Sequence, residues 1–562
     1  MAALSDVGTV IETDVLVMGG GLAGLPAAIA ARDRGVDVSV MDKGGIERSG
    51  AIAGGIDHFI AYLNQGEAWD TREGYLAYVG RVARGAVDLA IHEKVYCDFL
   101  ADAIGLIEKR LGLSMTDGRT GTYYRTQSMG QPGPLWINFD GKNLKPALAK
   151  ETRRVGCRVL PKVIATGLLT EGGRVVGAAG LHARTGEFHL VVAKAVIAAT
   201  GNTNRLFRTQ GGLPFNTWLC PYDTGDAQAH AFEVGAALTN MEYVRMTVVP
   251  KGFSAPGFNA FTGMGCRFIN AKGEAFMERY HAQGDRAPRN VVANAVLAEF
   301  QAGRGPVYVD GRHLDPADLE HLAMTLQVDK DTLPDYLHQR RVDFSKELFE
   351  VGISEGMQAG PSEVAGSGIM IDERCAATVP GLFAVGDCAD QIRCAHMAVT
   401  GGLAAGRHAA EYAKGLPASA PDVERAAALR RRTLAPLERR GGITAREVED
   451  RIRDIMSDRV GPVRNAAGLR GAQSALDAVA PELDRIAARD NHEAMRAAET
   501  RSLHAIGRIM AAAALYREES RFVPFHSRED FPETDDRRWC GLVVCRPGAS
   551  GGVDTGFKAL RY

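Results

Sequence analysis

The sequence has few features of a disulfide-bonded, membrane-spanning or nucleic-acid-binding protein. Its nine cysteines are scattered singly, without a Cys-x-x-Cys pair, so they predict neither a disulfide framework nor the closely spaced thiolates that usually hold an iron–sulfur cluster. No apolar run approaches the roughly 18 residues of a membrane span, and the first residues lack the pattern of a secretion signal. Lys plus Arg (66) almost equals Asp plus Glu (68), which leaves no basic surplus for nucleic acid or anionic lipid. We therefore expect a cytoplasmic protein without a metal site of its own.

Glycine and apolar residues are plentiful instead, and their distribution divides the chain. The 65 glycines among 562 residues exceed an average share of roughly 7%, and 46% of the residues are hydrophobic. A chain of this length is expected to form two or three domains. Alternating apolar segments and glycine turns indicate a discontinuous α/β domain over residues 1–245 and 351–415. The looser stretch 246–350 is predicted to be an inserted cap, and 416–562 a helical domain with an irregular tail after Arg521.

A glycine-rich turn lies near the start of the first domain. Gly19, Gly21 and Gly24 form a G-x-G-x-x-G motif between an apolar strand at residues 13–18 and a predicted helix from Leu25 to Arg34. Small residues here let the backbone approach a pyrophosphate, whose charge is stabilised at the helix N-terminus. Alone, the three glycines would indicate only a turn. Between a strand and a helix they predict a dinucleotide-binding site.

A second strand and an acidic residue complete this unit. The strand is predicted from Val36 to Met41, and Asp42 and Lys43 follow it. Asp42 stands 18 residues after Gly24, at a position where a carboxylate can accept hydrogen bonds from ribose hydroxyls. We therefore include both Asp42 and Lys43 among the expected cofactor-binding residues.

Three later segments favour FAD over NAD as the dinucleotide. One follows a buried strand predicted over residues 191–199, and a second follows a strand at 382–385, where an aspartate can hold the ribityl or pyrophosphate end of a flavin. The third, at 400–403, is expected to open a helix near the flavin ring, so that its N–H groups stabilise negative charge at flavin N1 and O2. The residues assigned to FAD in these segments are Ala199, Thr200, Gly201, Gly386, Asp387, Thr400, Gly402 and Leu403.

Longer segments resemble one protein family over nearly the whole chain. Residues 47–56 are similar to a flavin-contacting loop, 225–236 to a cofactor helix, 286–292 to a cap segment and 519–532 to the C-terminal signature of the fumarate reductase/succinate dehydrogenase flavoproteins. The resemblance implies a doubly wound α/β fold: a Rossmann-like, glutathione-reductase-type FAD domain with an inserted α+β capping domain and a C-terminal helical domain. It adds Ser49, Gly50, Gly54, Gly55 and Asp226 to the expected cofactor-binding residues.

Within that family, the chain is most similar to the adenylylsulfate reductase flavoprotein (alpha) subunit. Residues 47–53, 218–225 and 303–310 carry this likeness. In covalently flavinylated members of the family a histidine follows Arg-Ser in the first loop, and here that place is Gly50. The resemblance therefore implies non-covalent FAD.

The substrate positions depart from the family pattern. The family's substrate histidine is replaced by Glu363, and a second arginine that clamps dicarboxylates has no equivalent in residues 397–402. In the adenylylsulfate reductases, the sulfonucleotide branch of the family, a phenylalanine stands where this chain has Ala398. Near the position of that branch's substrate-contacting arginine, this chain has only Lys251. The resemblance thus implies retained cofactor machinery and a rebuilt substrate pocket.

Three residues are the candidates for catalysis. By resemblance, Arg289 takes the place of the arginine that moves the proton in fumarate reductases. Because arginine stays protonated, it can equally be an anion clamp, or a salt-bridging residue away from the site. Glu363 is a candidate base or substrate ligand, with a solvated loop glutamate as the alternative. His396, just before a glycine pair, is a candidate hydrogen-bonding group for substrate or flavin.

A second set of residues is predicted to line the substrate pocket. For each of them, packing in a core or exposure at the surface is the alternative. The set comprises Trp218, Tyr243, Arg245, Lys251 and His58.

These features predict an FAD oxidoreductase that exchanges a hydride between flavin N5 and a small organic substrate. Electrons would then reach an iron–sulfur or ferredoxin-like partner, as the resemblance implies. Two alternatives remain open at this point. One is adenylylsulfate reductase itself, in which N5 adds to sulfur, and the other is a non-catalytic electron-transfer flavoprotein subunit.

Overall fold

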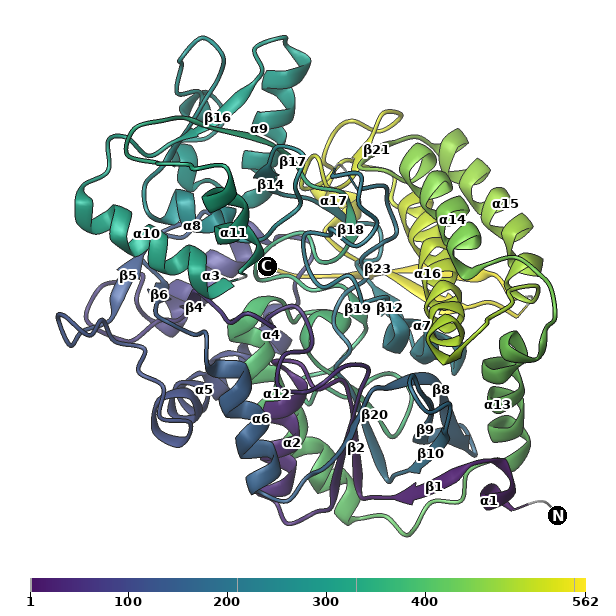
Figure 1. Ribbon diagram of the computed structural model, residues 1–562. Coiled ribbons are helices and arrows are strands. Elements are labelled where there is room, and N and C mark those ends of the chain that lie inside the picture. Colours follow the sequence, from purple (N-terminus) through teal and green to yellow (C-terminus); the bar gives the residue numbers. More distant parts are fainter. Residues whose placement is uncertain (1–2, 210, 330, 550) are drawn as a thin grey trace.

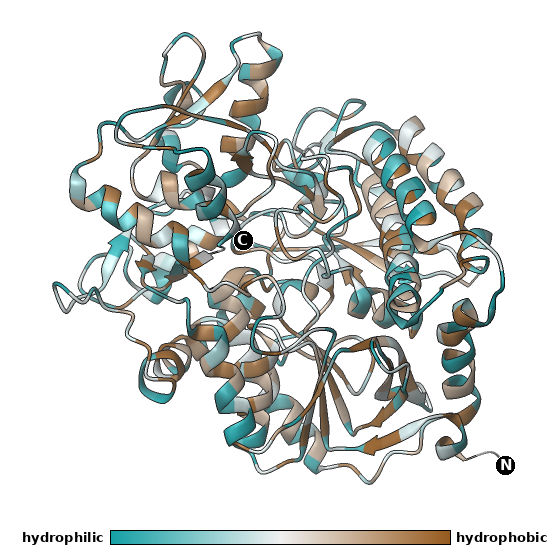
Figure 2. Cartoon of the chain, viewed as in Figure 1, coloured by the Kyte–Doolittle hydropathy of each residue, from teal (hydrophilic) through white to brown (hydrophobic). Residues whose placement is uncertain are grey.

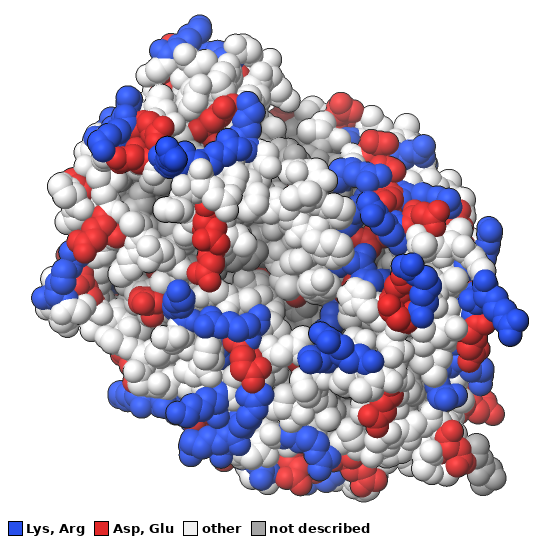
Figure 3. Space-filling view, in the orientation of Figure 1, with Lys and Arg blue, Asp and Glu red and all other residues white. Residues whose placement is uncertain are grey.

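The computed structural model describes residues 3–209, 211–329, 331–549 and 551–562. Figure 1 shows three regions: a body built on β-sheets, a cap beside it that carries helices α8 to α11, and a group of long helices, α13 to α16. Lys and Arg side chains are interspersed with Asp and Glu over the visible face (Figure 3), as the near-balanced composition predicts. Within the described residues, no helix has the length and apolar character needed to cross a bilayer.

A five-stranded parallel sheet carries the glycine-rich turn. Its strand order is β20–β11–β2–β3–β7, and β2 pairs with β3 so that Val15 lies opposite Val38. The strands other than the edge strand β7 are buried, as expected for a parallel sheet covered on both faces. The strands of this sheet are β2 (Val15–Met18), β3 (Val38–Asp42), β7 (Arg158–Pro161), β11 (Ala195–Ala198) and β20 (Leu382–Ala384).

Helices cover one face of this sheet, and a second sheet covers the other (Figure 1). The helices are α2 (Gly24–Arg32), α6 (Leu144–Arg154) and α12 (Cys394–Lys414). The second sheet has the order β1–β10–β9–β8, with strands β1 (Thr9–Glu12), β8 (Val163–Glu171), β9 (Arg174–His182) and β10 (Phe188–Val192). The predicted βαβ unit and α/β fold class are confirmed.

The single strand predicted over residues 191–199 is wrong, because this run forms parts of two strands in different sheets. Strand β10 ends at Val192 and β11 begins at Ala195. The chain crosses between the two sheets at Ala193 and Lys194, where Lys194 forms an ion pair with Asp14. Both strands are buried, so the apolar pattern continued across the crossing and concealed it.

The cap is an α+β unit. Its antiparallel sheet has the order β14–β17–β16–β15, and a helix that begins at Arg289 packs against three of its strands. The strands are β14 (Val248–Pro250), β15 (Arg267–Ile269), β16 (Val307–Asp310) and β17 (Phe349–Ile353). The helices are α8 (Phe258–Gly263), α9 (Arg289–Gln301), α10 (Pro316–Asp329) and α11 (Thr332–Gln339).

Smaller elements connect the cap to the body. A three-stranded sheet comprises β4 (His58–Ile60), β5 (Tyr124–Thr126) and β6 (Trp136–Asn138). A two-stranded sheet, β13 (Val244–Arg245) and β18 (Met357–Gln358), stands where the chain enters and leaves the cap. Further helices of the body are α3 (Arg72–Val82), α4 (Leu89–Val95), α5 (Leu100–Gly105) and α7 (Asp226–Glu233).

The helical region begins each of its helices with a side-chain cap. Asp422, Thr444, Asn465 and Asp490 each accept a backbone N–H of the following turn, and Thr444 forms a reciprocal capping box with Glu447. Apolar residues then face inward and polar ones outward (Figure 2). The helices are α13 (Val423–Glu438), α14 (Ala445–Arg459), α15 (Ala466–Leu483) and α16 (Asn491–Tyr516).

The tail after Arg521 was predicted to be irregular, and this prediction is wrong for its second half. Strands β23 (Gly541–Pro547) and β24 (Val553–Ala559) form an antiparallel hairpin. The hairpin joins β12 (Leu238–Thr239) and β19 (Gly368–Ile369), so the tail completes a sheet of the body. The Pro, Asp and Gly residues of the tail concealed the buried run from Leu542 to Cys545.

Candidate active site

A cavity of about 770 Å³ connects the glycine-rich turn to the cap. At one end it is lined by Gly19, Gly21 and Asp42, and at the other by Arg245 and Arg289. Most of the predicted cofactor residues and several predicted substrate residues therefore share one cavity. A dinucleotide cavity that reaches a set of charged side chains at a boundary between domains is the usual arrangement of a cofactor-dependent active site.

The glycine-rich turn shows two different reasons for its glycines. A Cβ on Gly24 would lie 1.9 Å from the carbonyl oxygen of Gly19, so this glycine permits close packing of helix and strand. A Cβ on Gly21 would meet nothing closer than the oxygen of Ala199 at 3.9 Å, although Gly21 lines the cavity. A side chain at Gly21 would therefore project into the cradle that a pyrophosphate needs. The turn fits FAD by this test.

Asp42 holds the loop that surrounds the nucleotide end. Its Oδ2 accepts hydrogen bonds from the backbone N–H of Gly20 at 2.7 Å and from Ser49 Oγ at 3.0 Å. Its Oδ1 accepts from the N–H of Gly44 at 2.8 Å. The carboxylate thus fixes the turn and the following loop, besides lying where a ribose would be recognised.

Lys43 connects this end of the cavity to helix α16 of the helical region. Its Nζ lies 2.7 Å from Asp226 Oδ2 and 3.0 Å from Glu499 Oε1, and it donates to Thr224 Oγ1 at 3.0 Å. The two carboxylates raise the pKa of Lys43 above its ordinary value, despite the opposing effect of burial. The helix that carries Asp226, α7, is thereby held against the cofactor cavity.

Lys145 lies outside the cavity but supports the glycine-rich turn at its cofactor end, and the sequence did not reveal this role. It is fully buried beneath the glycine-rich turn and donates hydrogen bonds to the carbonyl oxygens of Ile46, at 2.7 Å, and Gly20. Burial lowers its pKa to about 8. A single lysine near the start of a helix carries no sequence signal for this position.

Two segments of the central sheet edge complete the cofactor end. Ala199, Thr200 and Gly201 follow β11 and line the cavity, as do Gly386 and Asp387 after β20. Asp223, which was not predicted, lies against Gly201, and burial raises its pKa to about 8. A neutral acid at this place would not repel the phosphates of a dinucleotide.

The flavin-contacting loop after β3 is partly in the cavity. Ser49 and Gly50 line it, whereas Gly54 and Gly55 do not. Gly55 has φ +131°, and a Cβ there would lie 2.4 Å from the carbonyl oxygen of Val328. Gly55 therefore lets the loop approach the cap.

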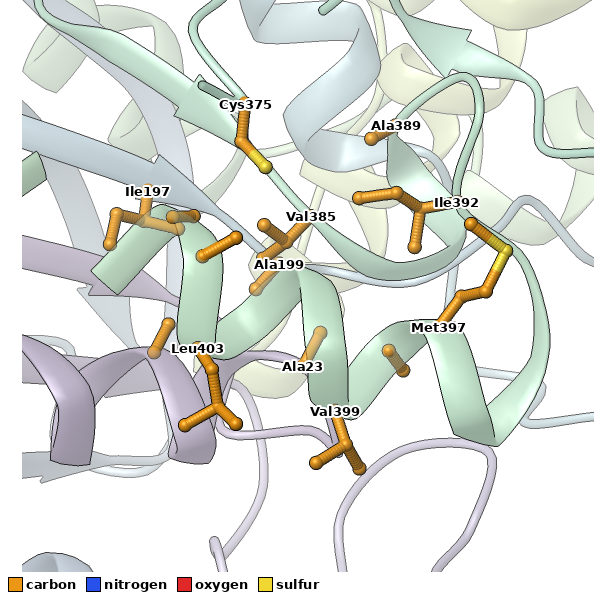
Figure 4. Packing of buried hydrophobic residues seen from close by; sticks show 14 of the residues in the cluster. Ala23, Ile197, Ala199, Cys375, Val385, Ala389, Ile392, Met397, Val399 and Leu403 are labelled. Carbon is orange, nitrogen blue, oxygen red and sulfur yellow. The ribbon is translucent and has the colours of Figure 1, made fainter. Parts of the chain in front are cut away.

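The helix expected to open at Thr400 begins earlier, at Cys394, and this prediction is wrong. Its first turn, from Cys394 to His396, lines the cavity, while Thr400, Gly402 and Leu403 lie inside the helix and away from it. A Cβ on Gly402 would lie 2.4 Å from the oxygen of Ala23. Figure 4 shows Leu403 and Val399 of α12 next to Ala23. The glycine pair thus serves close packing of α12 on the cofactor domain.

A cluster of arginines occupies the cap end of the cavity. Glu363 Oε1 accepts hydrogen bonds from Arg245 Nη2 and Arg289 Nε. Arg289 Nη1 also donates to Thr247 Oγ1 at 2.7 Å. Arg289 and Glu363 lie 74 residues apart and are both buried, so the cap is joined to the body by a charged contact inside the cavity. We call Arg245, Arg289, Arg393 and Glu363 the arginine cluster.

Arg393 and Cys394 are members of this end that the sequence analysis did not select. Arg393 Nη1 donates to Asp387, and Cys394 Sγ donates to Glu363 Oε2 at 2.5 Å. The sequence could have indicated them, because they lie between two predicted site residues, Asp387 and His396.

Trp218 lies over the arginine cluster. Its ring centroid is 5.0 Å from the guanidinium carbon of Arg289 and 5.7 Å from that of Arg245, distances at which cations are attracted to an aromatic face. Burial and the neighbouring guanidiniums of Arg393 and Arg289 lower the pKa of Arg245 well below its ordinary value, and Cys394 and Asp387 oppose this effect. Such a site favours a bound anion.

The two predicted histidines also line the cavity. His396 is buried, its Nε2 has no hydrogen-bond partner among the described residues, and burial lowers its pKa well below the ordinary value. His58 stacks on Trp136 with ring centroids 4.0 Å apart, and its Nδ1 lies 2.8 Å from Asp57 Oδ1. A neutral His396 is a hydrogen-bonding group rather than a cation.

Two predicted substrate residues are not in the cavity. Tyr243 is buried against Phe522 and His526 of the C-terminal segment, with ring centroids 5.6 and 6.2 Å away. Lys251 is exposed and pairs with Glu350 on the surface of the cap. The C-terminal segment encloses Tyr243, and no local pattern around residue 243 indicates that contact.

The arrangement can bind an anion and a dinucleotide side by side. When bound, FAD supplies N5 as the atom that gives or takes a hydride. The chain's residues would hold its pyrophosphate at the glycine-rich turn, and Gly386, Asp387 and the first turn of α12 would lie along its other end. Arg289 and Arg245 would orient an anion, and the cap above them would exclude water.

Comparisons with known proteins agree with this reading. The family described as FAD binding domain matches residues 14–405, and that described as fumarate reductase flavoprotein C-term matches residues 449–561. An uncharacterized FAD-dependent oxidoreductase of Methanocaldococcus jannaschii is 28% identical over 98% of both chains. An L-aspartate oxidase of Streptomyces coelicolor is 28% identical over 96% of this chain and 92% of its own.

A solved structure extends the likeness to the whole fold. Adenosine-5-phosphosulfate reductase in complex with sulfite, as a covalent adduct, superposes with a TM-score of 0.89 and 25% identity, over 100% of this chain and 98% of that one. The resemblance to the sulfonucleotide branch is therefore present in structure as well as in sequence. The chain belongs to the FAD-binding family matched over residues 14–405 and is an FAD-dependent oxidoreductase of the fumarate reductase/succinate dehydrogenase flavoprotein type.

Proposed function

We propose that this enzyme exchanges a hydride with a small organic anion that binds at the arginine cluster. The observation that carries the proposal is the buried contact of Arg289, from the cap, with Glu363, from the body, inside the cofactor cavity. Three guanidiniums converge on this end of the cavity, and Trp218 covers two of them. Guanidiniums bind carboxylates and similar planar anions through paired hydrogen bonds.

In this proposal Arg289 binds the anion and supplies or withdraws the proton that accompanies the hydride. It sits at the first residue of α9, behind Pro288, so its backbone position is fixed by the start of the helix. Thr247 holds one end of its guanidinium. His396, kept neutral by burial, orients the substrate or the cofactor by a hydrogen bond. The proton-transfer role of Arg289 rests on the family resemblance.

The electrons are proposed to reach, or to come from, an iron–sulfur or ferredoxin-like protein on a separate chain. This proposal rests on the resemblance to the sulfonucleotide branch and on the cysteine pattern. Six of the nine cysteines are buried in the described structure. The cytoplasmic location stays a prediction of the sequence.

Adenylylsulfate reductase is the second candidate, favoured by the full-length structural match to a sulfite-bound reductase of that class. The substrate positions speak for the first candidate. Ala398 and Glu363 line the cavity where the family resemblance implies other residues, and Lys251 lies outside it.

An anaerobic titration of the purified flavoprotein distinguishes the candidates. The flavin absorbance would be followed while small organic acids, alcohols, amines and finally sulfite with AMP are added to the oxidised form, and their unsaturated or oxidised counterparts to the reduced form. A redox change with an organic acid is the expected result. A sulfite adduct that depends on AMP would support the second candidate, and a flavin that responds to nothing but a reduced iron–sulfur protein would support a non-catalytic electron-transfer subunit.

A further inference from the structure

His58 and Asp57 form an oriented pair in the wall of the cavity. Both residues line it, and their side chains are 17% and 11% exposed. His58 Nδ1 lies 2.8 Å from Asp57 Oδ1. Because an ionised carboxylate can only accept hydrogen bonds, it selects the tautomer in which Nδ1 carries the hydrogen. In the singly protonated ring, Nε2 is then an acceptor.

A second contact fixes the plane of the His58 ring. The ring stacks on Trp136 with centroids 4.0 Å apart and an interplanar angle of 19°. The two residues begin β4 and β6, which are antiparallel partners in one sheet. Trp136 is fully buried against the cap, since a Cβ on Gly263 of α8 would lie 2.7 Å from its Cζ3. The fold thus sets both the tautomer and the plane of the imidazole.

Nε2 is the ring nitrogen of His58 that remains for a ligand. None of the described residues forms a hydrogen bond with it. Burial lowers the pKa of His396, and the nearby charges of His92 and His58 contribute to this effect, so His58 and His396 line the same part of the cavity. The cap reaches the cavity through Asn259 of α8, the helix that packs on Trp136. An oriented acceptor therefore lies open beside a candidate catalytic residue.

From this geometry we infer that His58 determines substrate specificity by accepting a hydrogen bond from a hydroxyl group, so that the substrate is a small hydroxy acid. The inference rests on the proposed function, in which the anionic group binds at the arginine cluster, and it leaves the roles of Arg289 and His396 unchanged. A hydroxyl is the smallest neutral donor that such an acid can carry. A site built to bond a hydroxyl discriminates against the analogue that lacks it, because its acceptor is then left unpaired.

A binding experiment tests this inference. Propionate, lactate and 3-hydroxypropionate have three carbons each and differ in the presence and the place of one hydroxyl group. Each would be titrated by anaerobic isothermal calorimetry into the FAD-loaded protein in its reduced form, which cannot take up a hydride. We expect the wild type to bind at least one of the two hydroxy acids at least about 3-fold more tightly than propionate, as one net hydrogen bond would allow.

Two variants remove the acceptor. His58→Phe keeps a ring on Trp136 but has no Nε2, so it should bind all three acids within about 2-fold of the wild-type affinity for propionate. A double variant that adds Asp57→Asn also removes the carboxylate that the single change leaves without its partner, and it should behave in the same way. The spectrum of the bound flavin reports folding in each variant.

His321 provides a matched control in the cap. Its ring stacks on Tyr124 with centroids 3.9 Å apart and an interplanar angle of 18°, and its Nε2 lies 3.1 Å from Asp117 Oδ2. This second stacked pair of histidine and aspartate does not line the cavity. His321→Phe should therefore keep the wild-type preference for a hydroxy acid.

The inference is overturned if neither hydroxy acid binds the wild type more tightly than propionate does. It is also overturned if the preference persists in the two variants of His58 with their flavin bound, or if His321→Phe loses it as well. The anaerobic redox titration judges the proposed function separately. Electron exchange with an organic acid, in a protein without the preference, would keep that function and reject the role of His58. A preference that His58→Phe removes, in a wild type that exchanges electrons with no organic acid, would do the reverse.

Discussion

Lys43, one residue past the second strand of the nucleotide fold, has its Nζ 3.0 Å from Oε1 of Glu499, which is 456 residues further along the chain. The same nitrogen lies 2.7 Å from Asp226. Glu499 is in turn bonded by Arg205 at 2.7 Å, and it is fully buried. The cofactor cavity and the helical region are therefore connected through one ammonium group.

Replacing Lys43 by Met should destabilise the protein and weaken FAD binding. The change leaves Asp226 without its cation and reduces the neutralisation of Glu499, both of which are buried. Because the lysine side chain is 18% exposed, we expect a loss of about 3 kcal/mol, at the lower end of the cost of breaking a buried ion pair. The free energy of unfolding from urea denaturation measures it. Lys346→Met, which breaks an exposed pair with Asp343, should have little effect.

The fit of helix α12 on the cofactor domain gives a second prediction. An added Cβ on Gly402 would lie 2.4 Å from the oxygen of Ala23, so Gly402→Ala should cost about 1–3 kcal/mol, as overpacking of a core does. It should also lower FAD affinity, since Ala23 belongs to the glycine-rich turn. Thermal unfolding with and without added FAD measures both effects.

The matched control is Gly415→Ala, at the end of the same helix. Gly415 has φ −81°, and a Cβ there would meet nothing closer than 3.8 Å. This change should raise stability by about 0.4–1 kcal/mol, because alanine restricts the unfolded chain. Equal effects at the two glycines would contradict the packing role of Gly402.

Whether the sequence alone predicted a part of the site depends on how far apart along the chain the interacting residues lie. The glycine-rich turn, Asp42 and the segments after β11 and β20 were predicted because each depends on local geometry that a strand–turn–helix pattern announces. Arg289 and Glu363 were selected through the family resemblance. Their contact with each other joins two domains, and no pattern within either segment reveals it.

The failures have the same physical origin. The segment 400–403 was expected to open a helix, whereas the helix begins at Cys394, which has φ +63°. Glycines open turns and also allow helices to pack closely, and only the neighbouring element decides between these uses. Tyr243 was predicted to line the pocket. The C-terminal segment that encloses it lies about 280 residues away in the chain, so the sequence around Tyr243 does not reveal this contact.

The acidity of Asp390 predicts a dependence of stability on pH. Burial raises its pKa to about 6, from an ordinary value of 3.8, although Thr239 and the N–H of Ile371 donate hydrogen bonds to it. The folded protein therefore binds this proton more tightly than the unfolded chain does, and stability falls as pH rises from about 4 to 6. At about 1.4 kcal/mol per pKa unit, the loss is about 3 kcal/mol.

Asp390→Asn isolates this contribution from those of other groups. The amide has nearly the same shape and does not titrate, so the difference in unfolding free energy between variant and wild type should grow in favour of the variant between pH 4 and 6 and then stay constant. Urea denaturation of the FAD-loaded proteins at several pH values measures it. Parallel pH curves for the two proteins would show that Asp390 does not titrate in this range.

The mode of FAD attachment can be tested directly. Gly50 stands where covalently flavinylated members of the family have a histidine, and its φ of +82° is one that other residues rarely adopt. We expect acid precipitation to release all of the flavin into the supernatant, as measured by its absorbance. Flavin fluorescence that stays with the denatured polypeptide on a gel would contradict this expectation.

The role of Arg289 is open to a test that keeps its charge. Arg289→Lys retains a cation but removes the fork that contacts Glu363 and Thr247 together, so kcat/KM for the substrate found in the anaerobic titration should fall at least about 100-fold. The flavin content and its absorbance spectrum should be unchanged, because Arg289 lies at the cap end of the cavity. Arg286→Lys, three residues earlier on an exposed turn, is the control and should retain full activity. If Arg289→Lys retained wild-type kcat/KM, the guanidinium would not be the group that binds the anion, and the arginine cluster would be a structural contact between the cap and the body.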